Sequence, residues 1–283
     1  MPLCEVARGV ELYYEDFGEG PPIVFTSAGN LTHKIWMGQV AGLAPDIRTI
    51  TYDIRGTGLS TKPRAGYSAP AAAADLCALT ERLALGPATM VAHEIGTHIA
   101  LMAAEKRPDL VSGLVLLSGG PWFHGERDGV TAGVADDFLA FLTGQSERGV
   151  PYPQICEEMI GTWLFRNPPT TGVVHALLEQ ALAWPQFVLN ALSQSMRDVD
   201  HRHRLPILSC PILIVHGRHD RKQLFVGAAH MAKLARTARL VTLEHSAHMG
   251  QLEELVTFNR LLAEFVRAIA PKETGRRLLT GQS

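Results

Sequence analysis

The chain has 283 residues, of which 46% are hydrophobic, so it can bury a large core without disulfide bridges or a metal. It carries 26 lysine and arginine residues against 28 acidic residues, a formal net charge of −2. This balance argues against a nucleic-acid partner or a dedicated polyanion-binding surface.

The cysteines and the hydropathy of the chain bear on its compartment. Cys4, Cys77, Cys156 and Cys210 are too widely spaced for a metal knuckle or a redox pair, which predicts reduced thiols in the cytoplasm. No apolar run reaches the ~18 residues of a membrane span, and the first residues lack the pattern of a signal peptide. We therefore expect a cytoplasmic protein with no membrane partner.

Short apolar runs typical of buried strands alternate with helix-length segments. Residues 9–15 alternate in polarity and predict part of an antiparallel edge hairpin. The remaining predicted strands cover residues 22–26, 47–52, 88–92, 111–117, 211–216 and 239–243, and the clearest helices cover residues 69–85, 95–106 and 252–269. This order predicts an α/β fold, with a parallel sheet covered by helices on both faces.

The alternation stops between residues 121 and 205, where helix-like patches occur without a convincing strand. Such a segment is too long for a plain crossover between strands and predicts a helical cap. The expected organisation is a core of residues 1–120 and 206–270, a cap insertion at 121–205 and a frayed tail at 271–283.

A candidate reactive residue follows the predicted strand 88–92. There the chain reads Ala92-His93-Glu94-Ile95-Gly96 and enters a helix, the pattern of a nucleophile elbow with glutamate at the reactive position. Small flanking residues suit the strained turn that such an elbow requires. The backbone N–H of Ile95 would point toward a developing oxyanion.

Two later residues suit the roles of acid and histidine. Asp220 follows the predicted strand 211–216, and His248 follows the strand 239–243. The chain order of nucleophile, acid and histidine is that of a triad in which the acid orients the imidazole.

Together these motifs resemble the α/β-hydrolase fold family over roughly residues 8–270. Residues 9–25 resemble the opening hairpin of the family, and residues 53–60 (DIRGTGLS) resemble its D-x-R-G-x-G-x-S loop. The resemblance implies a mostly parallel eight-stranded sheet with a helical cap, a small-molecule substrate, no cofactor, no metal, and a monomer or homodimer.

The chain departs from the family at two places. Where relatives usually have His-Gly, this sequence has Ser27-Ala28-Gly29-Asn30, so Gly29 or Asn30 would supply the second oxyanion-hole N–H. Most relatives also hold serine at the elbow, whereas dehalogenases and epoxide hydrolases hold aspartate. Epoxide hydrolases further use two cap tyrosines, and the predicted cap contains only Tyr152.

Three functions remain open for Glu94. The first is a cofactor-independent hydrolase of a small, largely apolar ester, lactone, epoxide or similar molecule, with a Glu94-His248-Asp220 triad. The second is a lyase, isomerase or cyclase, in which an apolar cap raises the pKa of Glu94 so that it shuttles protons. The third is a ligand-binding pseudoenzyme. Candidate residues for the substrate pocket are His33, Trp122, Trp163 and Trp184.

Overall fold

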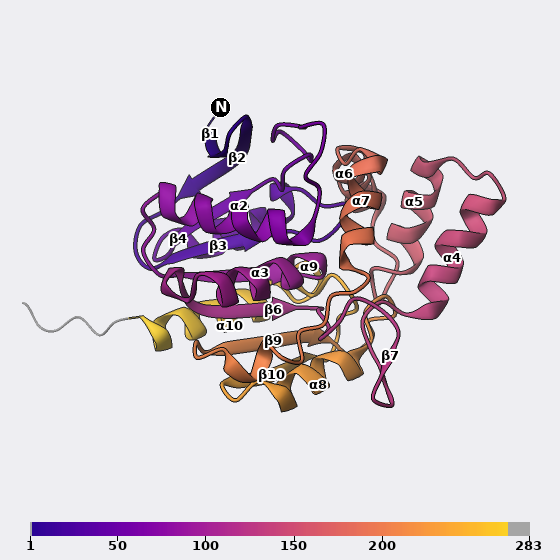
Figure 1. Cartoon of the computed structure of the whole chain (residues 1–283). Coiled ribbons are helices and arrows are strands. Elements are labelled where there is room, and N and C mark those ends of the chain that lie inside the picture. The colour runs from indigo at the N-terminus through magenta and orange to yellow at the C-terminus, as the bar shows by residue number, and fades with distance from the viewer. Residues whose placement is uncertain (1, 271–283) are drawn as a thin grey trace, which may run out of the picture.

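The computed structural model describes residues 2–270, so the predicted tail at 271–283 lies outside the described residues. One sheet has the strand order β1-β2-β4-β3-β5-β6-β9-β10 (Figure 1). β2 is antiparallel to both β1 and β4, and the other neighbouring strands are parallel. The strands are β1 (Leu3–Ala7), β2 (Val10–Phe17), β3 (Pro22–Thr26), β4 (Arg48–Tyr52), β5 (Ala88–His93), β6 (Val111–Leu117), β9 (Ile212–Gly217) and β10 (Ala238–Leu243). The predicted eight-stranded, mostly parallel sheet is confirmed.

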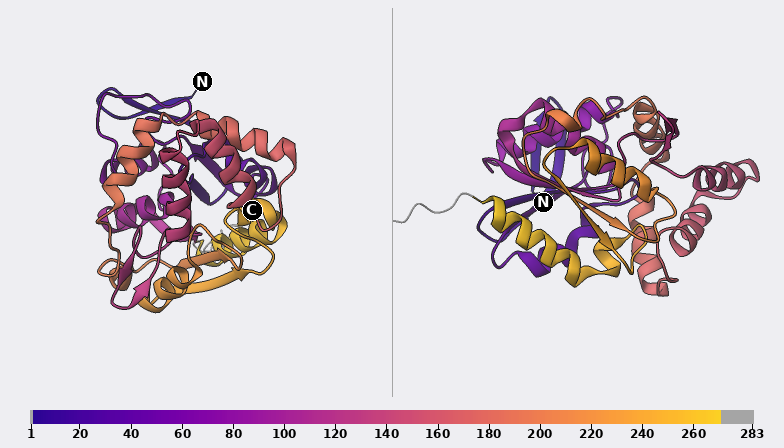
Figure 2. Two further views of the ribbon diagram at one scale, coloured as in Figure 1. Left: turned by 90° about the vertical axis from the view of Figure 1, so that its right-hand side faces the viewer. Right: turned by 90° about the horizontal axis from the view of Figure 1, so that it is seen from below.

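Helices cover both faces of this sheet (Figure 2). α2, α3 and α8 pack on one face, and α1 and α10 pack on the other. The helices are α1 (Met37–Leu43), α2 (Ala69–Arg82), α3 (Ile95–Lys106), α4 (Asp136–Glu147), α5 (Tyr152–Thr162), α6 (Thr171–Leu182), α7 (Gln186–Met196), α8 (Phe225–Leu234), α9 (Gly250–Glu253) and α10 (Leu255–Ile269), with 3-10 helices at His33–Trp36, Pro108–Leu110 and Leu205–Ile207.

The apolar strands divide their side chains between two cores. Along β3, Ile23 and Phe25 belong to the core beneath α1 and α10, whereas Val24 belongs to the core beneath α2 and α3. Successive side chains of a strand point to opposite faces, so a strand covered on both sides is apolar at every position. This explains why the buried strands appear in the sequence as continuous apolar runs.

Helices α4 to α7 lie between β6 and β9 in the sequence and beyond one end of the sheet in space (Figure 1). β5 and β6 both end on this side, so residues that follow these strands face the helices. The carboxyl edge of a parallel sheet is the usual place for a ligand site in an open α/β fold.

The structure differs from the sequence predictions in two elements. The predicted helix over 252–269 is divided into α9 and α10 at Glu254, which has φ −123° and ψ 50°. The segment 121–205, predicted without strands, contains a small hairpin of β7 (Glu126–Arg127) and β8 (Val130–Thr131). Within residues 2–270, no helix combines the length and apolar character needed to cross a bilayer.

Candidate active site

The turn between β5 and α3 places Glu94 at the carboxyl edge of the sheet. Glu94 has φ 50° and ψ −112°, a left-handed conformation that is strained for a residue with a side chain. Its N–H donates to the Leu117 carbonyl at 3.0 Å, which holds the turn against β6. A Cβ added to Gly96 would lie 2.8 Å from the Thr26 carbonyl oxygen, so glycine is required where helix and strand approach. The local geometry is that of a nucleophile elbow.

The carboxylate of Glu94 occupies the anion site formed by backbone N–H groups. Its Oε2 accepts a hydrogen bond from the Gly29 N–H at 2.9 Å, and the Ile95 N–H is close enough to the carboxylate to lower its pKa. These are two of the groups predicted to form an oxyanion hole. The third candidate, Asn30, uses its side-chain Oδ1 to accept a hydrogen bond from the Tyr152 hydroxyl at 2.9 Å.

The surroundings of Glu94 favour its charged form. Burial alone raises the pKa of this carboxyl, but Lys222, His248 and the N–H groups of Gly29 and Ile95 outweigh burial and lower the pKa to about 2. The lowered pKa contradicts the rise toward neutrality that the second of the three open functions requires, because the Lys222 ammonium and backbone N–H groups compensate the carboxylate inside the site. Glu94 is an anion at neutral pH.

Because the pKa of Glu94 is lower in the folded chain than its usual value of 4.5, the ionised residue stabilises the fold above about pH 4.5. That contribution decreases as the pH falls toward about 2. We expect the stability difference between wild type and E94Q to shrink by about 2 kcal/mol from about pH 6 to about pH 3. Urea unfolding at each pH measures it, with E19Q as the exposed control. A difference independent of pH would contradict this prediction.

Asp220 and His248 form a buried pair. His248 Nδ1 lies 2.9 Å from Asp220 Oδ2, while the backbone N–H groups of Lys222 and Gln223 each donate to Asp220 Oδ1 at 2.9 Å. Burial raises the pKa of Asp220, but His248, His216 and the Gln223 N–H outweigh it and hold the pKa well below its usual range. The ionised acid therefore fixes the imidazole orientation, and His248 Nε2 is buried with no hydrogen-bond partner among the described residues.

His93, the residue before Glu94, supports this imidazole from the elbow. Its ring centroid lies 4.6 Å from that of His248, and its Nε2 lies 3.0 Å from the His248 carbonyl oxygen. Burial holds the pKa of His93 well below its usual value, so the neutral ring can donate this hydrogen bond through Nε2. The elbow and the histidine loop are thereby connected directly.

Lys222 is the site residue that sequence reasoning missed. Its Nζ lies 3.3 Å from Glu94 Oε1, and the two side chains are only 9% and 7% exposed. The ammonium also lies 5.5 Å from the centre of the Phe138 ring. The one signal available in the sequence is that Lys222 comes two residues after Asp220, in the loop that carries the acid.

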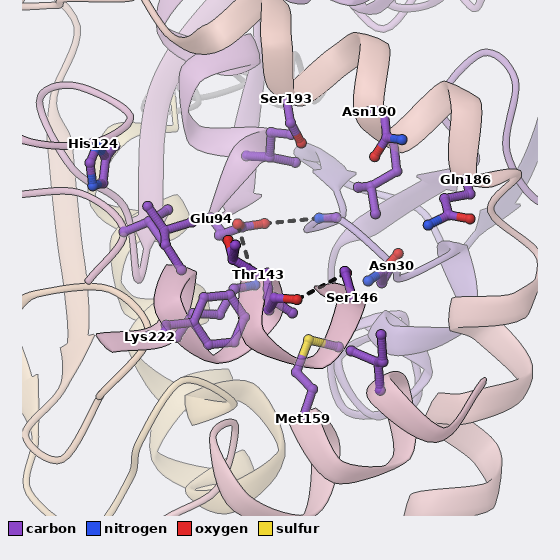
Figure 3. A pocket seen from close by; sticks show the side chains of 18 of the residues that line it. Asn30, Glu94, His124, Thr143, Ser146, Met159, Gln186, Asn190, Ser193 and Lys222 are labelled. Carbon is purple, nitrogen blue, oxygen red and sulfur yellow. Dashed lines mark hydrogen bonds and ion pairs between the residues drawn. The ribbon is translucent and has the colours of Figure 1, made fainter. Parts of the chain in front are cut away.

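A cavity of about 930 Å³ opens in front of Glu94. Its walls come from the carboxyl edge of the sheet and from α4, α5 and α7. Figure 3 shows Glu94 and Lys222 facing one another in this cavity, with polar side chains around them. Apolar residues such as Phe138, Leu139 and Leu189 line it together with the polar residues Asn30, His124, Thr143, Ser146, Tyr152, Gln186, Asn190, Ser193, Gln194 and Arg197.

A second, much smaller cavity of about 10 Å³ adjoins the first. Gly29, Lys222 and His248 all line it. This volume is close to the minimum that holds one water molecule, and the polar groups around it could bind that water. His248, whose Nε2 has no hydrogen-bond partner among residues 2–270, therefore borders a space the size of one water molecule.

The four predicted pocket residues lie outside the large cavity. His33 Nδ1 contacts Asp53 Oδ1 at 2.9 Å, and the Nε1 groups of Trp122 and Trp184 each donate to a backbone carbonyl at 2.8 Å. Trp163 packs on aromatic rings of α4. The polar atoms of His33, Trp122 and Trp184 thus have partners within the protein, and the Trp163 ring packs against other rings, so the structure places these residues in packing roles. Within residues 2–270, no cluster of three or more His, Cys, Asp or Glu side chains could hold a metal ion.

Comparisons with known proteins agree with this architecture. The model of the alpha/beta hydrolase fold family matches residues 21–255. A 2-(acetamidomethylene)succinate hydrolase of Mesorhizobium japonicum is 33% identical over 80% of each chain. The non-heme chloroperoxidase CPO-A1 of Kitasatospora aureofaciens is 29% identical over 94% of this chain and 99% of that protein.

The structure of the esterase EaEST from Exiguobacterium antarcticum superposes with a TM-score of 0.86 at 25% identity, over 94% of this chain and 98% of that one. The family match covers most of the sequence and includes the elbow and the acid loop. The chain is therefore an enzyme of the α/β hydrolase fold family.

Proposed function

We propose that this enzyme is a cofactor-independent hydrolase in which Glu94 is a nucleophile toward a saturated carbon. The carboxylate would form a glutamyl ester with the substrate, and a water activated by His248 would hydrolyse that ester. Asp220 would orient the imidazole and stabilise its protonated form.

The position of the Glu94 carboxylate is the observation that carries this proposal. Its Oε2 is held by the Gly29 N–H, whereas Oε1 lies on the side of Lys222. A substrate ester attacked by Glu94 would need an oxyanion site for its own carbonyl oxygen, but the carboxylate already occupies that site. Attack on a saturated carbon forms no tetrahedral carbonyl oxyanion, since the negative charge goes to the departing halide or epoxide oxygen. Oε1 can therefore attack while Oε2 stays in place.

The same N–H groups would serve the second half of the reaction. When water attacks the glutamyl ester, negative charge develops on Oε2, where the Gly29 N–H already donates. His248 borders the water-sized cavity, and its Nε2 has no hydrogen-bond partner in the described part of the chain, as a general base for that water requires.

The cavity favours a sizeable and largely apolar substrate with a few oxygen atoms. Its volume of about 930 Å³ suits a molecule of drug size. We propose epoxides and activated alkyl halides as the reactive groups, with segment 121–205 serving as the cap over them. The pKa of Glu94 argues against the lyase, isomerase and cyclase alternatives, which need a carboxyl that exchanges protons near neutrality.

Trapping the ester tests the proposal. H248A should accumulate a covalent adduct with styrene oxide or phenacyl bromide, localised to Glu94 by peptide mass spectrometry, because ester formation needs only the carboxylate. E94Q should form no adduct at this position. In a single turnover of wild type in water labelled with ¹⁸O, the product hydroxyl should carry unlabelled oxygen from Glu94.

Each alternative has its own outcome. Product labelled with ¹⁸O in the first turnover would mean that water attacks the substrate directly, with Glu94 in another role. Binding of the probes without an adduct or turnover would support the ligand-binding pseudoenzyme.

A further inference from the structure

Lys222 occupies a buried position that the triad does not explain. The shortest ion pair of its ammonium is with Glu94 Oε1 at 3.3 Å, and no other carboxylate lies within 4 Å of it among residues 2–270. Burying a lysine is costly unless its charge is paired. Once Glu94 becomes a neutral ester, this pairing is lost, so the first step of the proposed reaction leaves a buried cation without its anion.

The oxygen that Lys222 contacts has a defined fate in that reaction. Because Oε2 is held by the Gly29 N–H, Oε1 is the oxygen available to attack. It therefore becomes the bridging oxygen of the glutamyl ester and, after hydrolysis, the hydroxyl oxygen of the product. This oxygen leaves as an alkoxide unless it receives a proton in the same step.

We propose that Lys222 is the general acid that protonates Oε1 as the product alcohol leaves Glu94. This role rests on the glutamyl-ester mechanism proposed above. His248 takes one proton from the water, and the hydroxide adds to Cδ of Glu94. The bond from Cδ to Oε1 then breaks, its electron pair stays on Oε1, and a proton moves from Nζ to that oxygen.

The proton balance restores the starting site. The glutamic acid formed by water addition gives its proton to the neutral Lys222 amine, which re-forms the ion pair. His248 releases the proton taken from the water to solvent, where it balances the halide ion lost in the first step or, for an epoxide, the proton that the opened-ring oxygen takes up from solvent. No further co-reactant is required.

The loop geometry suits the two roles, general base for His248 and general acid for Lys222. The Lys222 backbone N–H donates to Asp220 Oδ1, so the acid that orients His248 also fixes the loop from which Lys222 reaches Oε1. Lys222 and His248 both border the water-sized cavity, which Gly29 also lines. His248 can accept a proton from the water while Lys222 protonates the departing oxygen.

The rate of ester decay tests this role separately from ester formation. Wild type, K222M and K222Q are mixed with phenacyl bromide, excess reagent is removed, and the Glu94 adduct is followed by intact-mass spectrometry. We expect decay in K222M and K222Q to be at least about 100-fold slower than in wild type, so that the adduct persists although His248 is present. K34M is the control, because Lys34 pairs with Glu179 at the surface.

The outcomes separate the two proposals. If H248A traps the ester while K222M releases it at the wild-type rate, Lys222 is not the acid and the nucleophile assignment stands. A defect of K222M and K222Q confined to ester formation also overturns the role of Lys222. If no probe gives an adduct on Glu94 in H248A, the glutamyl-ester mechanism itself fails. Circular dichroism and the melting temperature establish that each variant is folded.

Discussion

Replacing Glu94 with serine is expected to convert this enzyme into an esterase. In E94S the Gly29 N–H loses the carboxylate that it now binds, the nearby Ile95 N–H loses the same negative charge, and both become available to a substrate oxyanion. The Asp220-His248 pair is already assembled, and the His248 Nε2, which binds no group of residues 2–270, can activate the new hydroxyl. General-base assistance contributes about 100-fold or more, and each oxyanion-hole donor about as much again. We expect hydrolysis of p-nitrophenyl butyrate to rise at least about 100-fold over wild type.

Three variants serve as controls for this gain of activity. E94A should remain at the wild-type level because it provides the vacant anion site without a nucleophile. E94S/H248A should lose the gain because the base is missing. E94S/K222M removes the buried lysine, which has lost its carboxylate partner once Glu94 is replaced. The release of p-nitrophenol and the acyl-enzyme mass measure the outcome. Equal activity of E94S and E94A would show that the elbow geometry does not bring residue 94 within reach of His248.

The sheet could be predicted closely from the sequence because its strands are buried on both faces. β3 and β6 have the predicted boundaries, and the other predicted parallel strands agree to within about a residue. The break at Glu254 could not be predicted in this way. Its Oε2 accepts hydrogen bonds from the His245 N–H at 3.0 Å and from Ser246 Oγ, and the carboxylate of Glu253 likewise binds the Ala247 N–H at 2.7 Å. Contacts to the histidine loop, and not helical periodicity, determine the break.

The positions of the three predicted triad residues follow from motifs that encode backbone geometry. A strand followed by a tight turn and a helix predicts where Glu94 lies, and the ends of later parallel strands bring Asp220 and His248 to the same edge. The sign of the pKa shift on Glu94 could not be read in this way. It depends on Lys222 and the backbone N–H groups, whose directions are set by the folded loops.

The predicted pocket residues are not the ones that line the observed cavity, for a related reason. An aromatic residue in a helical segment has the same sequence pattern whether it packs internally or faces a ligand. Trp184 donates to the Leu31 carbonyl and is fully buried, so its polar group has a partner within the protein. Residues such as Asn190 and Ser193 reach the cavity instead, because α7 presents them on the side facing Glu94 (Figure 3).

The contact between the acid loop and the histidine loop is expected to be the most sensitive point of the scaffold. Gly217 ends β9, and a Cβ added there would overlap the backbone of Ala247 and approach the Ser246 carbonyl oxygen to 2.6 Å. The neighbouring His219 N–H donates to that same Ser246 oxygen at 3.0 Å, so neither backbone can move alone. We expect G217A to lower the free energy of unfolding by about 3 kcal/mol, since backbone atoms cannot relax as a flexible side chain could.

The same substitution should impair chemistry beyond its effect on stability. Asp220 and His248 lie on the two loops that the added methyl group forces apart, and a displacement of about 1 Å in a catalytic group can cost about 100-fold in rate. We therefore expect decay of the Glu94 ester in folded G217A to slow by about that factor, measured below its melting temperature. G161A on α5 is the matched control, because within residues 2–270 a Cβ added to Gly161 meets no atom within 4 Å apart from its neighbours in the same helix, and alanine should be neutral or slightly stabilising there. If the ester on Glu94 is hydrolysed in G217A at the wild-type rate, the distance between the two loops does not determine how Asp220 and His248 are positioned relative to Glu94.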